Sequence, residues 1–250
     1  MPETDTVESF GANGVLGIGL FAYDCGLACT AQSAAVPAIY FNCLSASASC
    51  TPTSVPLADQ VQNPVWRFSQ DNNGVIISLP PIAASGAASV TGTLVFGIGT
   101  TANNGLGSAQ VYTTDARGEF MTIYNGKSYP GSYLDTGSSV LFILDSLTLG
   151  IPTCAANTAA GGEYCPTSTA SYTVTTLGFN GVSGTVSFSI ANANTLASSN
   201  NWAFNDVAAP FTSRRAEAFA LGLPFFFGRN VFIAIEGHNT PGGTGPYWAY

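Results

Sequence analysis

The residues best suited to chemistry lie in a short loop that begins at Asp135. The loop follows the apolar Leu134 and reads Asp135-Thr136-Gly137-Ser138. An aspartate carboxylate can activate a water molecule as a general base. Gly137 lets the backbone turn tightly beside that carboxylate, Ser138 can donate a hydrogen bond to it, and Thr136 can bond across to a partner loop. The pattern therefore predicts a water-activating carboxylate on a tight turn.

The same four residue types also fit a simpler structure. In a hairpin turn, Asp135 would accept hydrogen bonds from its own following backbone and carry out no chemistry. A chain rich in Gly, Ser and Thr forms such a pattern by chance more often than an average chain. The sequence on either side of the loop therefore distinguishes the two interpretations.

Two runs of apolar residues that end in glycine flank the loop along the chain. They read Val15-Leu16-Gly17 before the loop and Leu221-Gly222 after it. With the loop they resemble the pepsin-like aspartic peptidases, in which such a run follows each catalytic loop and packs beneath it. The order of the elements is also that of the family. The alternative is two ordinary strands that each contain a glycine.

The resemblance covers nearly the whole chain and is closest to an uncharacterised bacterial group of exported pepsin-like proteins. It implies an all-β, pepsin-like acid protease barrel and an aspartic-type endopeptidase in which Asp135 is catalytic. Thr136, Gly137 and Ser138 would support the catalytic loop. The substrate would be an extended peptide or protein held in a cleft between two lobes.

The sequence departs from the family in one respect. A complete two-lobed enzyme has two Asp-Thr/Ser-Gly loops, and only Asp135 is followed by such a pair here. We therefore expect an incomplete bilobal fold, with the second lobe and the C-terminal part of the first. A lone aspartate is ionised at neutral pH and has no acidic partner. The chain is expected to be inactive unless a missing first lobe or a second copy completes the pair, and the alternative is a non-catalytic pepsin-like binding or surface module.

Composition predicts the fold class independently. Charged residues make up 8% of the 250 residues, so few amphipathic helices can form. Short helices are expected only near residues 144–149 and 213–220. Runs of β-forming residues between turns indicate an all-β sandwich or barrel. These runs are residues 75–79, 90–96, 120–124, 172–177, 185–190 and 231–235.

The polar turn at residues 115–118 is the best place for a domain boundary. Residues 1–115 would then form the remnant of the first lobe and an interlobe segment. Residues 116–250 would form the second pepsin-like lobe, which carries the Asp-Thr-Gly loop.

The six cysteines indicate disulfides and an extracytoplasmic protein. Cys154 and Cys165 are alone in the second half of the chain, so we expect them to pair. The alternative is buried free thiols in a cytosolic protein. No two cysteines have Cys-x-x-Cys spacing, and the chain has one histidine, so no metal site and no cofactor are expected. The acidic start at Met1 is not an export signal, which places any signal segment upstream.

Charge and hydropathy exclude two kinds of partner. The formal net charge is -8, which leaves no basic surface to hold a phosphate backbone, so nucleic acid is not expected. No apolar run approaches the ~18 residues of a membrane-spanning helix. Peptide or protein substrate remains the expected partner.

Overall fold

The structure, a computed structural model, describes residues 6–11, 13, 17–32, 35–43, 49–211 and 218–250. Strands far outnumber helices within these residues, which confirms the predicted all-β class. Val15 and Leu16 lie outside the described residues, as does most of the stretch 213–220. Ala220, the last residue of the helix expected at 213–220, is not helical. It begins a strand in which every residue is buried.

The larger of the two main sheets holds the Asp135 loop. It is seven-stranded, and in spatial order its strands are β10 (Ser183–Ile190), β9 (Ala170–Leu177), β6 (Phe120–Tyr124), β7 (Lys127–Asp135), β12 (Ala220–Gly222), β8 (Leu141–Ile143) and β11 (Ala208–Pro210). The chain leaves β7 through the loop and returns as β8, but β12 lies between these two strands. It runs parallel to β7 and antiparallel to β8.

The second main sheet is five-stranded. In spatial order its strands are β4 (Thr93–Phe96), β3 (Gly74–Leu79), β13 (Arg229–Ala234), β16 (Tyr247–Ala249) and β5 (Val111–Thr113). The late strands β13 and β16 pair with the early strands β3 and β5. Strands from both sides of residue 116 therefore share one sheet, and the division of the chain at that point remains a prediction.

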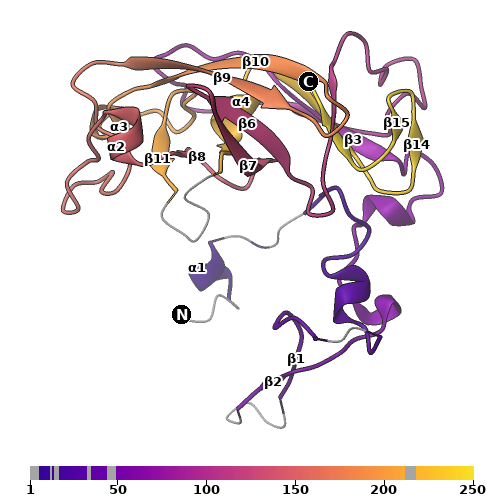
Figure 1. The fold of residues 1–250 in the computed structure, drawn as a ribbon. Coiled ribbons are helices and arrows are strands. Elements are labelled where there is room, and N and C mark those ends of the chain that lie inside the picture. The colour runs from indigo at the N-terminus through magenta and orange to yellow at the C-terminus, as the bar shows by residue number, and fades with distance from the viewer. Residues whose placement is uncertain (1–5, 12, 14–16, 33–34, 44–48, 212–217) are drawn as a thin grey trace.

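Short elements complete the described chain. The remaining strands are β1 (Phe41–Asn42) with β2 (Thr51–Pro52), and β14 (Asn239–Thr240) with β15 (Gly243–Thr244). The α-helices are α1 (Val7–Phe10), α2 (Ser146–Leu149), α3 (Ala193–Ala197) and α4 (Leu223–Phe226), and the 3₁₀ helices are η1 (Gly26–Cys29), η2 (Leu57–Asp59) and η3 (Val65–Arg67). In Figure 1 the segment that carries β1 and β2 projects away from the two main sheets.

The main hydrophobic core joins the two large sheets. One cluster of buried side chains includes Leu134 and Leu221 from the first sheet and Val231 and Ile233 from the second. Along β9, buried residues alternate with more exposed ones, as in a strand with one face on a core. Burial of Leu134 fixes the end of β7, so the next residue, Asp135, is directed away from the core.

Three disulfides are formed, Cys25–Cys29, Cys43–Cys50 and Cys154–Cys165. The last is the pair expected from the sequence. Within the described residues, no helix has the length and apolar character needed to cross a membrane.

Replacing Cys154 and Cys165 together by Ala is expected to lower the free energy of unfolding by about 3 kcal/mol, because the bond closes a loop in the unfolded chain. The two cysteines are 11 positions apart. The matched control is the Cys25→Ala, Cys29→Ala double variant, whose separation of 4 predicts a smaller loss. Urea denaturation under non-reducing conditions measures both. An equal loss for the two variants would contradict the loop-length argument.

Candidate functional site

The site is built around the carboxylate of Asp135, which stands at the end of β7. Its Oδ1 accepts a hydrogen bond from the backbone N–H of Gly137 at 2.8 Å, and its Oδ2 accepts one from the Ser138 hydroxyl at 2.7 Å. The backbone N–H of Ser138 also donates to the carbonyl of Asp135 at 3.2 Å. The turn therefore holds both carboxylate oxygens, and Asp135 stays partly accessible while Thr136 is exposed.

Strand β12 lies directly beside this loop. Leu221 is in register with Leu134, and Gly222 is in register with Asp135. The backbone N–H of Leu223 donates to the carbonyl of Ser138 at 2.8 Å. The later of the two glycine-ending runs is therefore in contact with the loop, between the strand that enters it and the strand that leaves it.

Gly222 makes this close approach possible. A Cβ at this position would lie 2.1 Å from the carbonyl oxygen of Val140 and 2.6 Å from that of Ser138. Both atoms belong to backbone that a side-chain rotation cannot move. Residue 222 must therefore be glycine for β12 to reach its place under the loop.

The earlier run cannot be placed in the same way. Val15 and Leu16 are outside the described residues. Gly17 is described and exposed, and a Cβ built there would meet no atom within 4 Å. The described residues therefore do not approach Gly17 closely, in contrast to Gly222.

The loop borders two hollows. Asp135 lines one of about 340 Å³, together with apolar side chains such as Leu20 and Trp248. Thr136 lines the other, of about 350 Å³, together with apolar side chains of β3 and β4 such as Val75 and Leu94. The loop thus lines two open depressions, each with partly apolar walls.

Two charged residues that sequence reasoning missed line the same hollow as Asp135. They are Arg117 and Glu119, and Glu119 is 7% exposed. Asp115 positions them, because its Oδ1 accepts hydrogen bonds from the backbone N–H groups of Arg117 at 2.8 Å and Glu119 at 3.0 Å. The sequence predicted a domain boundary at this turn. No motif in the sequence indicated that the turn would lie beside the Asp135 loop.

Asp206 is the most buried carboxyl among the described residues, at 3% exposed. Burial raises its pKa. A carboxyl with a raised pKa stabilises the fold while protonated, and this contribution is lost as pH rises through the raised value. Asp206→Asn is therefore expected to gain stability relative to the wild type between about pH 4 and about pH 7.

Denaturation of both proteins at the two pH values measures this effect. Asp145→Asn is the opposite case, because the N–H of Thr148 donates to the Asp145 carboxylate and lowers its pKa. A lowered pKa stabilises the fold at neutral pH, so this variant should lose stability relative to the wild type as pH rises. A pH-independent difference for Asp206→Asn would contradict the prediction.

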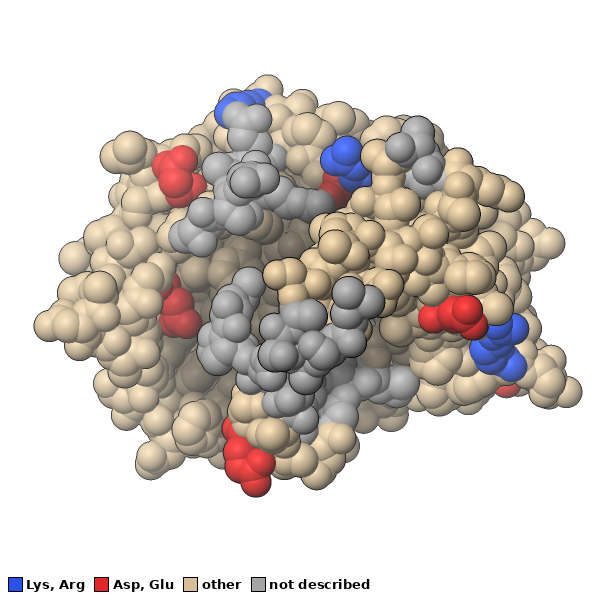
Figure 2. All heavy atoms as spheres, turned by 90° about the horizontal axis from the view of Figure 1, so that it is seen from below, with Lys and Arg blue, Asp and Glu red and all other residues tan. Residues whose placement is uncertain are grey.

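The described residues contain no group of three His, Cys, Asp or Glu side chains that could hold a metal ion. On the face shown in Figure 2, charged side chains are few and do not gather into a patch of one sign. The side chains that line the hollow at Asp135 include the carboxyl groups of Asp135 and Glu119 and the guanidinium of Arg117.

Comparison with known protein families gives a match over the whole chain. The model of a family described as "Protein of unknown function (DUF3443)" matches residues 1–250. The chain belongs to the DUF3443 family. No curated protein and no solved structure matches the chain. The family description states no activity.

Proposed function

We propose that this chain carries one half of an aspartic-type endopeptidase site on a pepsin-like fold, with Asp135 as one of the two catalytic aspartates. The observation that carries the proposal is the bracing of this carboxylate. Its two oxygens accept hydrogen bonds from Gly137 and Ser138, and β12 lies beside it in register through Gly222. A chance hairpin turn explains the first feature but not the second.

The proposed reaction needs a second carboxyl group. Two close carboxyls share one proton, so that one acts as the base that takes a proton from water and the other donates a proton to the carbonyl oxygen. The sequence has one Asp-Thr-Gly loop, so in the two-loop arrangement of the family the partner aspartate belongs to a first lobe or to a second copy of the chain. Activity should favour acid pH, where one carboxyl of the pair is protonated.

The proposed substrate is an extended peptide. The two hollows beside Asp135 and Thr136 have apolar walls, and β4 lies at the edge of its sheet with Leu94 exposed. An edge strand can pair with the backbone of an extended chain while alternate side chains enter pockets. We also propose an extracytoplasmic location, because the three disulfides persist in oxidising compartments.

A second candidate is a pepsin-like binding module that performs no hydrolysis. The single Asp-Thr-Gly loop favours it, because one carboxylate without an acid partner cannot complete the reaction. Such a module would hold extended peptides in the same two hollows without cleaving them.

Incubation of the product of the full reading frame with a mixture of unstructured peptides, at several acid and neutral pH values, tests the proposal. Mass spectrometry identifies cleavage, and a pepstatin-type inhibitor is added in parallel. Cleavage at acid pH that the inhibitor blocks supports the peptidase. Peptide binding without cleavage supports the binding module, and cleavage that the inhibitor leaves unchanged would contradict the proposed site.

A further inference from the structure

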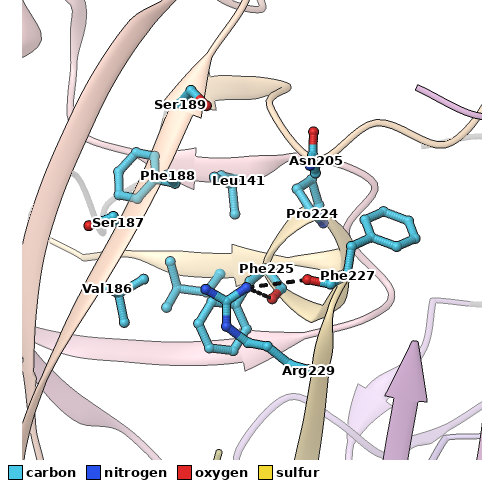
Figure 3. Close-up of a pocket in the computed structure, with 11 residues that line it drawn as sticks. Leu141, Val186, Ser187, Phe188, Ser189, Asn205, Pro224, Phe225, Phe227 and Arg229 are labelled. Carbon is cyan, nitrogen blue, oxygen red and sulfur yellow. Dashed lines mark hydrogen bonds between the residues drawn. The ribbon is translucent and has the colours of Figure 1, made fainter. Parts of the chain in front are cut away.

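A smaller cavity, of about 140 Å³, lies between β10 and the segment that joins α4 to β13 (Figure 3). It shares no lining residue with the two hollows at the Asp135 loop. Val186, Leu221 and Phe225 line it and are buried in the core, while polar atoms make up the larger part of its exposed wall. One charged group, the guanidinium of Arg229, also lines it.

Arg229 is held in a fixed orientation. Its Nη1 donates to the carbonyl oxygen of Phe225 at 2.5 Å and to that of Phe227 at 3.5 Å. The guanidinium carbon lies 4.5 Å from the centre of the Phe225 ring. Figure 3 shows one nitrogen turned toward the two carbonyls and the rest of the guanidinium between them and Val186.

These contacts leave the Nε and Nη2 edge of Arg229 unused by the described residues. Both acceptors, the carbonyl oxygens of Phe225 and Phe227, lie at the end of α4. Stabilising the end of this helix therefore explains the position of Nη1 but not that of the other two nitrogens. No described acidic side chain forms an ion pair with the guanidinium. Burial lowers the pKa of Arg229, and the nearby Tyr250 hydroxyl opposes this shift. A cation is thus partly desolvated without a carboxylate beside it.

We propose that this cavity is a binding site for a carboxylate carried on a small apolar group. The free edge of a guanidinium offers two parallel N–H donors, which match the two oxygens of a carboxylate. Phe225 and Phe227 provide an apolar wall for the rest of the molecule. A cavity of about 150 Å³ accommodates benzene, so the ligand is an acid of about that size.

Polar groups at the cavity allow more than one kind of molecule to carry the carboxylate. Ser187, Ser189 and Asn205 also line it, and β10 lies at the edge of the seven-stranded sheet. The carboxylate can therefore belong to a free small acid or to the C-terminus of an extended peptide that runs along β10. The chemistry that Arg229 recognises is the same in both cases.

Titration of the protein with benzoate and with benzamide tests the site without any substitution. The two molecules have almost the same shape, but benzamide has no charge. Isothermal titration calorimetry should give a dissociation constant of about 1 mM or below for benzoate. Benzamide should bind at least about 10-fold more weakly, because it lacks the charge-assisted hydrogen bonds. Equal binding of the two, or no binding of benzoate, would overturn the proposal.

Arg229→Lys keeps the charge but removes the planar pair of donors, so benzoate affinity should fall about 10-fold or more. The matched control is Arg67→Lys, because Arg67 is exposed and lies outside this cavity. Circular dichroism checks the fold of both variants, and if Arg229→Lys does not fold, the benzoate and benzamide comparison on the wild type decides. Unchanged benzoate affinity in folded Arg229→Lys would overturn the assignment of Arg229.

A short apolar peptide, with a free or an amidated C-terminus, then distinguishes the two sources. Tighter binding of the free-carboxylate peptide than of benzoate identifies a chain terminus as the ligand. Binding of benzoate alone identifies a small acid. Equal binding of the free and amidated peptides, together with no preference for benzoate over benzamide, would overturn the proposal.

Discussion

Asp135→Asn is expected to lower peptide hydrolysis by the product of the full reading frame by about 10²–10⁴-fold, the usual contribution of a positioned general acid or base. An amide cannot take a proton from water. The substitution keeps the shape of the side chain, and its carbonyl oxygen can still accept the hydrogen bond that Gly137 donates at 2.8 Å. The loss should therefore appear in the turnover number, with little change in stability.

The stability of Asp135→Asn separates chemistry from folding. Asp135 is partly exposed, so its replacement leaves no buried charge unpaired. Asp145→Asn is the matched control for hydrolysis, because Asp145 is an exposed helix N-cap that lines neither hollow at the loop. Steady-state kinetics on an unstructured peptide measures both variants. Hydrolysis that survives in Asp135→Asn at the wild-type rate would exclude Asp135 as a catalytic residue.

The sequence predicted the local features of this site well. The hydrogen bond from Ser138 to Asp135 follows from two residues three positions apart on a turn, and the structure has it at 2.7 Å. The expected strand at residues 120–124 also has those bounds in the structure. Such features depend on neighbours along the chain, which periodicity and turn residues reveal.

Features that depend on pairing between strands far apart in the sequence were harder to predict from the sequence. The register between β6 and β7 shifts near Gly131, which has a φ of +85°. This irregularity sets which residues of β7 face the core, and hence the direction of Asp135. A glycine inside a strand can mark such a bulge, but the sequence does not say which strand is its partner. Arg117 and Glu119 reach the site for the same reason, through pairing and not through a motif.

The short helices α3 and α4 were also not predicted. Asn192 caps α3 by accepting a hydrogen bond from the N–H of Thr195, yet α3 has too few residues to show a helical period. Helix α4 begins directly after Gly222, with Pro224 in its first turn. Its residues are a short apolar run, and such a run fits a strand as well as a helix.

Gly222→Ala is expected to destabilise the protein by about 3 kcal/mol, the upper part of the range for adding a methyl group to a fully packed site. The new Cβ would lie 2.1 Å from the carbonyl oxygen of Val140. Relief requires β12 to move away from the loop, which also weakens the hydrogen bond that Leu223 donates to Ser138. Because Ser138 holds the Asp135 carboxylate, hydrolysis should fall even under conditions in which the variant remains folded.

Gly105→Ala is the matched control for this substitution. A Cβ at residue 105 meets no atom within 4 Å, and its backbone is not in the left-handed region, so the change should be neutral or stabilising by up to about 1 kcal/mol. Urea denaturation gives the stability of both variants. If Gly222→Ala were as stable as Gly105→Ala, β12 could not lie as close to the loop as the structure has it. The bracing that separates Asp135 from an ordinary turn aspartate would then be absent, and the proposal of a catalytic role would lose its support.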